Sequence, residues 1–376
     1  MKKNKTYLVI TPLFPTKESF VGSYVFDQVD EIRKQTDYHI RIIKIVSLHS
    51  REKDYTYGSF MVNVFKIFDF PFFILPGLFK KINNFRFIKF LKTKNIKNIS
   101  VSHAHVSYPC SYLQNILNCK KIVQHHGLDV LQLLNGRINF LRKMQRNFLI
   151  KNTVSILNNA DLNIGVSQKV LNQLHKFTEY KPNDEIVLYN GVNTSKFFNI
   201  EKNNSTYIIG CIANFWKIKD QITLIKSVQR LINKGKNIKL RFIGSGYTLK
   251  QCKDYVFTNN LTKNITFEKE LPHKELNRFY NNLDLFVLPS YYEALGCVYL
   301  ESWATNTPFI AVENQGISEI IPNNWKELML VPKSCDEVLT DKINYFMEHK
   351  VLFTFDQKYD IKNTISEFLK HKIFND

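Results

Sequence analysis

Residues 283–319 read LDLFVLPSYYEALGCVYLESWATNTPFIAVENQGISE, and they hold the strongest pattern in the chain. The apolar run at 283–288 has the length and composition of a buried parallel strand. A short helix is predicted to begin at Gly296 and to end before Pro308, where a second buried strand, Phe309–Val312, follows. The stretch is therefore predicted to form a β-α-β unit within a parallel sheet.

The loop between the first strand and the helix is predicted to bind an anion. Such a loop directs backbone N–H groups and the positive end of the helix dipole into the crevice at the sheet edge, which suits a diphosphate. Glu301 lies about one turn into the helix, where its carboxylate can accept two hydrogen bonds from ribose hydroxyls. Glu293 lies on the loop, nearer to whatever the phosphates carry. Together these groups predict a nucleotide sugar as the ligand.

Glu293 and Glu301 form an E-x7-E pair within PSYYEALGCVYLESWATNTPFIAV, and this segment resembles the donor-site signature of retaining GT-B glycosyltransferases of family 4. The Leu295–Gly296 step before the helix, and Gly316 and Glu319 after the second strand, add to the resemblance. Taken alone, the two acids have a second interpretation, as a loop cap and a first-turn carboxylate that complements the helix dipole.

The resemblance implies an α/β protein of the GT-B fold, with two Rossmann-like domains that face a central cleft. Residues 1–198 are the expected N-terminal, acceptor-binding domain, and residues 206–358 are expected to bind the nucleotide sugar. Residues 359–376 are expected to form a C-terminal helix that crosses back to the N-terminal domain. At 376 residues, the chain is long enough for two domains that each bury a core.

The resemblance also implies catalytic roles for three residues. Glu293 is expected to hold the sugar hydroxyls, Lys219 to stabilise charge on the departing diphosphate, and His126 to approach the sugar. Further donor contacts are expected from Gly22, Asn214, Lys217, Gly244, Leu271, Leu295, Gly296, Cys297 and Glu301.

The chain departs from the family pattern at Asn214, where the family usually has an Arg five residues before the Lys. Losing an Arg removes a planar and permanently charged fork for the phosphates. We therefore expect either Lys217 or the helix start at Gly296 to supply the missing interaction.

Segments of the N-terminal half resemble the family as well. Gly22 lies in the loop after the first predicted strand, 7–11, and His126 opens an H-G-x-D turn that ends at Asp129. A plain turn at Gly22, and a strand-end turn in which Asp129 caps a helix, are the alternative interpretations. The other matching segments are 103–113 (HAHVSYPCSYL), Ala160–Ser167 and Asn190–Asn193.

Positive charge is concentrated in the N-terminal half. Residues 1–200 hold 29 of the 52 Lys and Arg residues but 13 of the 33 Asp and Glu residues, a net charge of +16 out of +19. Within 64–97, eight basic residues alternate with nine Phe residues and one acid, Asp69. This composition predicts an interfacial surface that meets anionic lipid. The alternative is that the Phe residues fill a core and the Lys residues form a solvated face.

The residues expected to meet an acceptor or a membrane are Lys80, Lys81, Arg86 and Lys89. A second basic group consists of Arg137, Arg142, Lys143, Arg146 and Lys151. Nucleic acid is not an expected partner, because the sequence has no zinc-finger spacing, RNA-recognition signature or basic zipper.

No metal or other cofactor is expected. The sequence has no D-x-D, and His103 and His105 with Cys110 lack a nearby carboxylate or third ligand, so we interpret the two histidines as a strand-end pair in the cleft. The six cysteines include no C-x-x-C pair and indicate reduced thiols. The basic and then apolar N-terminus is predicted to be a strand and not a signal peptide.

These features predict a metal-independent hexosyltransferase that moves a sugar, with retention, from a nucleoside diphosphate sugar to a glycan acceptor. By family analogy the acceptor is lipid-linked, in the assembly of lipopolysaccharide O-antigen or capsule. The expected location is cytoplasmic and peripheral on the inner face of the cell membrane. Two alternatives remain open: a non-hydrolysing sugar-nucleotide epimerase of the same fold, and a non-catalytic membrane-surface binding protein.

Overall fold

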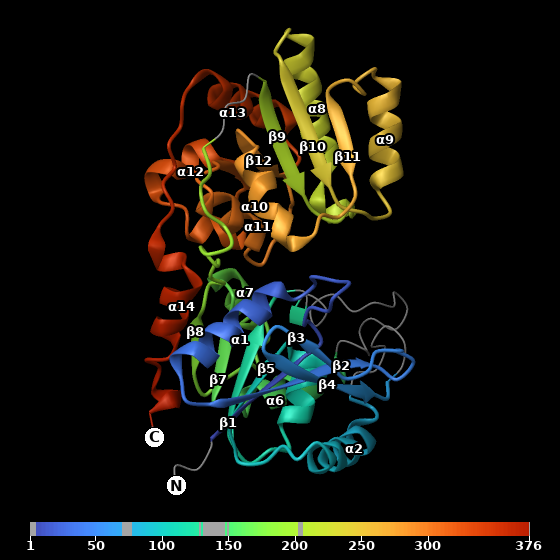
Figure 1. Ribbon diagram of the computed structural model, residues 1–376, viewed down its shortest axis with the longest axis vertical. Helices are drawn as coiled ribbons and strands as arrows, with labels where there is room; N and C mark the ends of the chain where they lie inside the picture. Colours follow the sequence, from blue (N-terminus) through green and yellow to red (C-terminus); the bar gives the residue numbers. More distant parts are fainter. Residues whose placement is uncertain are drawn as a thin grey trace. The chain divides into compact units, whose positions relative to one another are not determined.

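A computed structural model describes residues 5–69, 77–127, 129–130, 147–148, 150–201 and 206–375 (Figure 1). The chain divides into two compact units: unit 1 consists of Met1–Asn190 and Ile361–Asp376, and unit 2 of Gly191–Asp360. Residues 191–198, which we expected to close the first domain, belong to unit 2. There, Phe198 N–H donates to Asn277 Oδ1 at 2.9 Å, and Val192 N–H donates to the carbonyl oxygen of Tyr359 at 2.9 Å.

Unit 1 is built on an eight-stranded sheet of order β3-β4-β2-β1-β5-β6-β7-β8, in which only the β3–β4 pair is antiparallel. Its strands are β1 (Thr6–Thr11), β2 (His39–Ser47), β3 (Tyr55–Tyr57), β4 (Phe60–Ile67), β5 (Ile99–His105), β6 (Lys120–His125), β7 (Leu162–Gly165) and β8 (Glu185–Val187). Its helices are α1 (Ser23–Gln35), α2 (Lys80–Thr93), α3 (Tyr112–Gln114), α6 (Ser155–Asn158), α7 (Gln168–Leu174) and α14 (Ile361–Phe368). The first strand was predicted correctly, and all of its residues are buried because it lies between β2 and β5.

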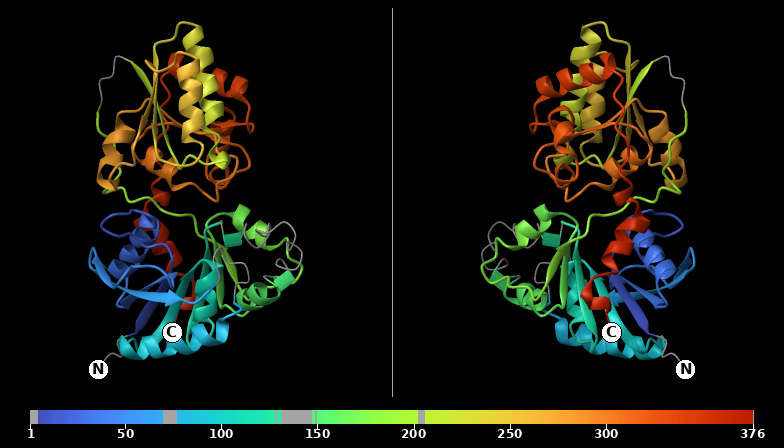
Figure 2. Two further views of the ribbon diagram at one scale, coloured as in Figure 1. Left: turned by 90° about the vertical axis from the view of Figure 1, so that its right-hand side faces the viewer. Right: turned by 90° about the vertical axis from the view of Figure 1, so that its left-hand side faces the viewer.

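Unit 2 is built on a six-stranded parallel sheet of order β11-β10-β9-β12-β13-β14. Its strands are β9 (Tyr207–Ile212), β10 (Ile238–Ile243), β11 (Ile265–Glu268), β12 (Leu285–Leu288), β13 (Phe309–Val312) and β14 (Leu330–Val331). Its helices are α8 (Gln221–Asn233), α9 (Leu249–Thr258), α10 (His273–Asn281), α11 (Cys297–Ala304), α12 (Asn323–Met329) and α13 (Asp336–Glu348). Helix α8 packs against α9 and α13, whereas α10 packs against α11 (Figure 2).

The predicted β-α-β unit is confirmed in unit 2. Strand β12, helix α11 and strand β13 follow one another, and β12 pairs with β13 in parallel, for example Phe286 with Phe309. Every residue of both strands is buried, which explains why each is a continuous apolar run and not an alternating one. The two sheets, which are parallel apart from the β3–β4 pair, also confirm the expected α/β class with two Rossmann-like domains.

The C-terminal helix α14 is part of unit 1, as expected for a helix that crosses back. It packs on α1, and its Ile361, Ile365 and Phe368 are buried in the core of that unit. At the helix start, Gln35 Nε2 donates to the carbonyl oxygen of Lys362 at 2.9 Å. A chain segment that follows the whole of unit 2 therefore completes the core of unit 1.

Replacing the Phe368 side chain tests this contribution. Phe368 is 2% exposed, so Phe368→Ala should destabilise unit 1 by about 3 to 5 kcal/mol through lost burial and the cavity left behind. All three tryptophans, Trp216, Trp303 and Trp325, lie in unit 2. In thermal melts of the variant, part of the circular dichroism signal should therefore be lost, as unit 1 unfolds, at a lower temperature than the one at which tryptophan fluorescence reports the unfolding of unit 2.

The matched control is Phe257→Ala on α9. Because Phe257 is 76% exposed, this substitution should lower the free energy of unfolding by less than about 0.5 kcal/mol. Equal losses of stability in the two variants would contradict a structural role for the C-terminal helix.

Candidate active site

Gly296 begins α11 with φ at +89°, a backbone conformation that suits glycine. A Cβ at this position would lie 2.6 Å from the ring of Tyr299, which is fully buried and donates its hydroxyl to the carbonyl oxygen of Leu288 at 2.8 Å. No side chain caps the helix start, so its first-turn N–H groups suit an anion, and the binding of a diphosphate there stays a prediction. Next to Gly296, Leu295 is 1% exposed and Cys297 half-buried, so Leu295 can offer a ligand little beyond its backbone.

Lys219 and Glu293 meet at the carboxyl edge of the unit 2 sheet. Lys219 ends a short 3-10 turn, η4 (Lys217–Lys219), after β9, and Glu293 lies on the loop after β12, the hydrogen-bonded neighbour of β9. Lys219 Nζ lies 2.5 Å from Glu293 Oε1, and the side chains are 20% and 12% exposed. The structure thus brings two of the predicted catalytic residues together, and each fixes the direction of the other.

Glu301 is held by a residue that the sequence did not reveal. The hydroxyl of Tyr280, on α10, donates to Glu301 Oε2 at 2.8 Å. Burial, and then the charge of the Glu301 carboxylate, raise the pKa of Tyr280 well above its usual value, so its hydroxyl keeps the proton that it donates. The predicted ribose-binding carboxylate is therefore oriented from a neighbouring helix.

The loop that carries Glu293 is tied to the segment after β13. Glu293 N–H donates to Gln315 Oε1 at 2.9 Å, and Gly316 N–H donates to the carbonyl oxygen of Glu293 at 3.3 Å. A Cβ on Gly316 would lie only 1.7 Å from the carbonyl oxygen of Ala294, so the two backbones approach as closely as they do because this residue is glycine. The sequence pointed to Gly316 but not to Gln315, whose role depends on a contact between two separate loops.

Two other expected phosphate contacts lie on the loop after β9. Asn214 and Lys217 are both exposed. The carbonyl oxygen of Asn214 accepts from Gln221 Nε2 at 3.0 Å, and Lys217 N–H donates to the hydroxyl of Tyr247 at 3.0 Å. Of the three expected residues on this loop, Lys219 is the one that the structure pairs with a second predicted residue.

The expected Gly244 and Leu271 lie on the next two loops of the same sheet edge. Gly244 follows β10, and a Cβ there would lie 2.2 Å from the carbonyl oxygen of Ala213, in the loop after β9. Leu271 follows β11 and is half-buried just before α10. Because the carboxyl ends of parallel strands share an edge, all expected donor residues of unit 2 gather there.

In unit 1, the expected Gly22 and His126 follow strands β1 and β6. Gly22 immediately precedes α1, and a Cβ there would lie 2.4 Å from the carbonyl oxygen of Leu13. The backbone at His126 is fixed by Asp129, whose Oδ1 accepts from His126 N–H at 3.2 Å. The other oxygen, Oδ2, accepts from Ser107 N–H at 3.1 Å.

Asp129 also lies beside the buried imidazole of His125, whose Nδ1 is 3.1 Å from Asp129 Oδ2. Burial alone would raise the pKa of Asp129, but the hydrogen bond and charge of His125 bring this pKa below its usual value. The carboxylate is therefore ionised, and it organises the turn that presents His126.

Three imidazole rings form a histidine file in unit 1: His103, His105 and His126. The ring centroids of His103 and His105 lie 4.3 Å apart, and those of His105 and His126 lie 5.3 Å apart, with nearly parallel planes. Burial lowers the pKa of His126 to about 4 and that of His103 to about 3, so both rings are neutral near pH 7. His103 and His105 lie at the end of β5, as the strand-end interpretation expected, and both side chains are fully buried.

The four basic residues expected at an acceptor or membrane are Lys80, Lys81, Arg86 and Lys89, all on α2. Lys81 and Lys89 are exposed, as expected. Lys80 and Arg86 are half-buried: Lys80 Nζ lies 5.8 Å from the centroid of the Tyr112 ring, and the Arg86 guanidinium lies 5.6 Å from that of Phe65. These cation–π contacts hold the Lys80 side chain against α3 and the Arg86 side chain against β4.

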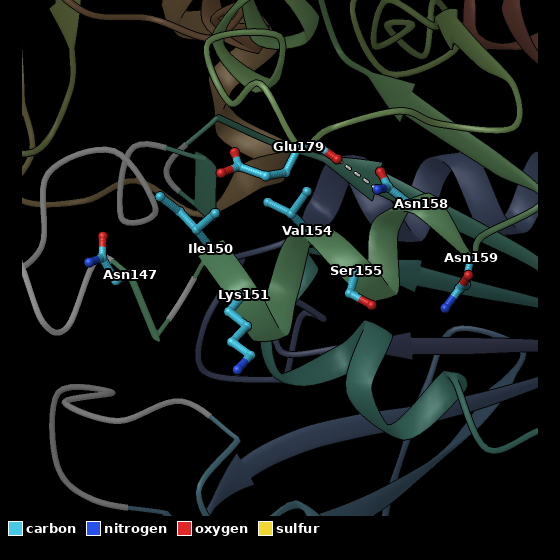
Figure 3. Close-up of a pocket in the computed structure, with 8 residues that line it drawn as sticks. All are labelled: Asn147, Ile150, Lys151, Val154, Ser155, Asn158, Asn159 and Glu179. Carbon is cyan, nitrogen blue, oxygen red and sulfur yellow. Dashed lines mark hydrogen bonds between the residues drawn. The ribbon is translucent and has the colours of Figure 1, made fainter.

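A hollow of about 660 Å³ lies beside α6 and the helical turn η3 (Ile150–Val154) in unit 1 (Figure 3). A hydrogen bond of 2.8 Å, from Asn158 Nδ2 to the carbonyl oxygen of Glu179, closes one side. Lys151 of the second basic group lines it, whereas Arg137, Arg142, Lys143 and Arg146 lie outside the described residues.

None of the helices in the described part of the chain is both long enough and apolar enough to cross a membrane. Within the same residues, no group of three or more His, Cys, Asp or Glu side chains is arranged to hold a metal ion. All six cysteines are free thiols.

Comparison with known proteins identifies relatives of both units. A family model described as Glycosyltransferase Family 4 matches residues 21–196, and one described as Glycosyl transferases group 1 matches residues 192–364. An uncharacterized glycosyltransferase of Methanocaldococcus jannaschii is 30% identical over 257 residues, which cover 66% of this chain and 67% of that protein. The capsular polysaccharide biosynthesis glycosyltransferase CapH of Staphylococcus aureus is 25% identical over 302 residues, which cover 75% of this chain and 78% of the relative.

Among solved structures, sucrose-phosphate synthase from Thermosynechococcus elongatus superposes with a TM-score of 0.72 at 16% identity, covering 97% of this chain and 94% of that one. At this identity the likeness establishes the fold, which is GT-B. Two parallel-sheet units, the two family models and the archaeal relative together show that the chain belongs to the family 4 and group 1 glycosyltransferases.

Proposed function

We propose that this glycosyltransferase transfers a hexose, with retention at the anomeric carbon, from a nucleoside diphosphate sugar to a glycan acceptor. The observation that carries the proposal is the Lys219–Glu293 ion pair beside the uncapped start of α11. A diphosphate at the helix start would meet backbone N–H groups and the Lys219 ammonium together. Glu301, held by Tyr280, is one turn further on and suits the ribose diol.

In the proposed reaction, the bond between the anomeric carbon and the phosphate oxygen breaks, and its electron pair leaves with the diphosphate. The acceptor hydroxyl oxygen forms the new bond on the same face, and its proton passes to the departing phosphate oxygen. Lys219 and the α11 amides stabilise the negative charge that grows on the diphosphate, which is where preorganised donors contribute most. Glu293, already aligned by Lys219 and Gln315, orients the sugar hydroxyls. We expect no metal ion to be required.

The acceptor class is proposed from charge and from relatives. The S. aureus relative is named for capsular polysaccharide biosynthesis, which favours a glycan of the cell surface. We propose a lipid-linked acceptor, with the protein peripheral on the inner, anionic face of the cell membrane.

One face of α2 supports this location, because apolar and basic side chains are exposed on it together. Phe85 is 72% exposed, Ile82 52% and Ile88 44%. With the exposed lysines, the residues of this α2 face are Lys81, Ile82, Phe85, Ile88, Lys89 and Lys92. At 3.6 residues per turn they fall within an arc of about 120°. Phe and Ile can enter the headgroup boundary while lysines meet anionic lipid.

Glu301→Gln tests the donor site while keeping the shape of the side chain. Hydrogen bonds to a charged group contribute about 1.5 to 3 kcal/mol each, so donor affinity should fall roughly ten- to a hundredfold. The measurement is thermal unfolding with a panel of UDP-, GDP- and other nucleotide sugars. A ligand at about a hundred times its Kd should stabilise the wild type by roughly 2.7 kcal/mol.

Undiminished turnover in Glu301→Gln would contradict the assigned role. Product analysis of the wild type separates the alternatives: a donor with altered stereochemistry and no transfer would indicate an epimerase. Binding without turnover would favour a non-catalytic protein.

Lys219→Ala tests stabilisation of the leaving group, with Lys217→Ala as the control from the same turn. Removing a preorganised donor to the transition state should lower kcat about a hundred- to a thousandfold. Lys217 is exposed, and its side chain is not paired with Glu293, so Lys217→Ala should have a much smaller effect. Steady-state kinetics with saturating donor distinguish the two variants. Equal losses of kcat in Lys219→Ala and Lys217→Ala would contradict a role for Lys219 in stabilising the leaving group.

Lys81→Ala combined with Lys89→Ala tests the membrane surface. Each basic residue near an anionic surface contributes about 1 kcal/mol, so partitioning onto phosphatidylglycerol vesicles at low salt should fall about thirtyfold. Phe85→Ser should weaken it further, whereas Phe257→Ser, an equally exposed Phe in unit 2, should not. Failure of the wild type to bind such vesicles at low salt would refute membrane association.

A further inference from the structure

The histidine file connects the core of unit 1 to the predicted catalytic His126. His103 and His105 are alternate residues of β5 and lie on one face of the sheet, and His126 follows β6, which pairs with β5. At the inner end, the hydroxyl of Tyr7 lies 2.7 Å from His103 Nδ1. At the outer end, His105 Nδ1 lies 3.1 Å from His126 Nε2. The only described polar partner of His126 Nε2 is therefore a neutral imidazole.

The surroundings of His105 Nε2 indicate which ring nitrogen of His105 carries the proton. His105 Nε2 is buried and has no hydrogen-bond partner among the described residues. A neutral imidazole carries one N–H and one lone pair, and an orphaned buried N–H is rarer than an unsatisfied acceptor. The lone pair therefore belongs on Nε2 and the proton on Nδ1, where it has an acceptor.

The residue opposite His105 in β6 agrees with this assignment. Gln124 is the register partner of His105, and its Oε1 accepts from Gln28 Nε2 at 2.9 Å. Gln124 Nε2 is a buried donor that likewise has no partner in the described part of the chain. An N–H on His105 Nε2 would add a second orphan donor to this region, whereas a lone pair would not.

We infer that His105 donates its Nδ1–H to His126 Nε2, holds His126 as the neutral Nδ1–H tautomer, and so makes His126 a hydrogen-bond donor toward a hydroxyl oxygen of the ligand. His105 is a positioning residue, since it acts through His126. Which nitrogen of a histidine is protonated is set by the bond that the other nitrogen makes. The identity of the ligand hydroxyl rests on the proposed function, but the tautomer does not.

The remaining contacts of His126 fix the orientation in which this donor is presented. Asp129 holds its backbone N–H, and the ring of Tyr24 on α1 lies 5.1 Å from its imidazole. Among the described residues, His126 Nδ1 has no hydrogen-bond partner in the protein. The tautomer imposed by His105 therefore places the one N–H of the ring on Nδ1, the nitrogen without a hydrogen-bond partner among the described residues.

His105→Phe is the variant that tests the inference, because Phe keeps a flat ring between His103 and His126 and removes the hydrogen bond. His103→Phe is the matched control, one ring further from His126. In 15N spectra of protein labelled on histidine, protonated and unprotonated ring nitrogens are separately resolved, and the His126 signals are assigned by their loss in His126→Asn. The wild type and His103→Phe should show His126 protonated at Nδ1, whereas His105→Phe should show both tautomers.

Kinetics supply a second readout that a purely structural role would not reproduce. His105→Phe should lower kcat/KM about tenfold, the loss expected for one neutral hydrogen bond, with little change in melting temperature. In His126→Asn, the amide stands near the position of Nδ1 and donates without help, so adding His105→Phe should cost nothing further. Such a double-mutant cycle isolates the coupling between the two residues.

An Nε2–H tautomer of His126 in the wild type would overturn the inference, and so would an Nδ1–H tautomer that persists in His105→Phe. Equal kinetic losses from His105→Phe with and without His126→Asn would also overturn it. If the tautomers are as expected but no nucleotide sugar binds the wild type, the proposed function fails and the assignment of His105 stands.

Discussion

The hydrogen-bonded pairing of β9 with β12 is the constraint on which the unit 2 site depends. Leu285 aligns with Ile209 and Phe286 with Gly210, so the two strands end at the same edge of the sheet. Lys219 and Glu293 are far apart in the sequence, yet they leave neighbouring strands in the same direction and meet at 2.5 Å. The apolar interior of both strands therefore positions a charged pair that no local pattern could place.

The two units satisfy their polar groups differently. In unit 2 the site is built from a partly buried ion pair and a tyrosine–carboxylate hydrogen bond. In unit 1, burial keeps the histidine file neutral, because a charged imidazole without a counterion would be costly inside a core. Asp129 stays charged because His125 and two backbone N–H groups surround it. The neutral file and the charged turn converge on His126.

Local signals predicted the fold well. The strand, helix and strand within 283–312 follow from the two apolar runs, from Gly296 at the start of the helix and from Pro308 after its end, which are signals that act over a few residues. The positions of Glu293 and Glu301 in this unit pointed to a ligand site, and the family resemblance gave that site a donor-binding role. Tyr280 and Gln315 were not predictable, because each acts across two elements whose packing no single stretch encodes.

On α2 too, the contacts that side chains make with other elements could not be predicted from the local sequence. The sequence has a dense mixture of basic and aromatic residues on α2, and the assignment of Lys80 and Arg86 to an acceptor- or membrane-facing surface stays a prediction. Both contact aromatic rings of unit 1, Tyr112 on α3 and Phe65 on β4. Helical phase does not separate Arg86 from Lys89, three residues further on, and the rings that contact Lys80 and Arg86 come from elements distant in the sequence. The end of the first domain was misplaced for a similar reason, since residues 191–198 are held by contacts with α10 and the segment near Tyr359.

Gln315 and Gly316 form a clamp on the Glu293 loop, because both donate to or accept from the Glu293 backbone, and this clamp affects the free energy of ligand binding. Its hydrogen bonds hold the Glu293 loop in the folded protein, and the close contact at Gly316 leaves that loop little room to move. A ligand that enters then loses less free energy to ordering the protein, and more of its contact energy appears as affinity. Selectivity at this loop would therefore arise from a conformation that exists before the ligand binds. Ligands would then differ mainly in their dissociation rates and less in their association rates.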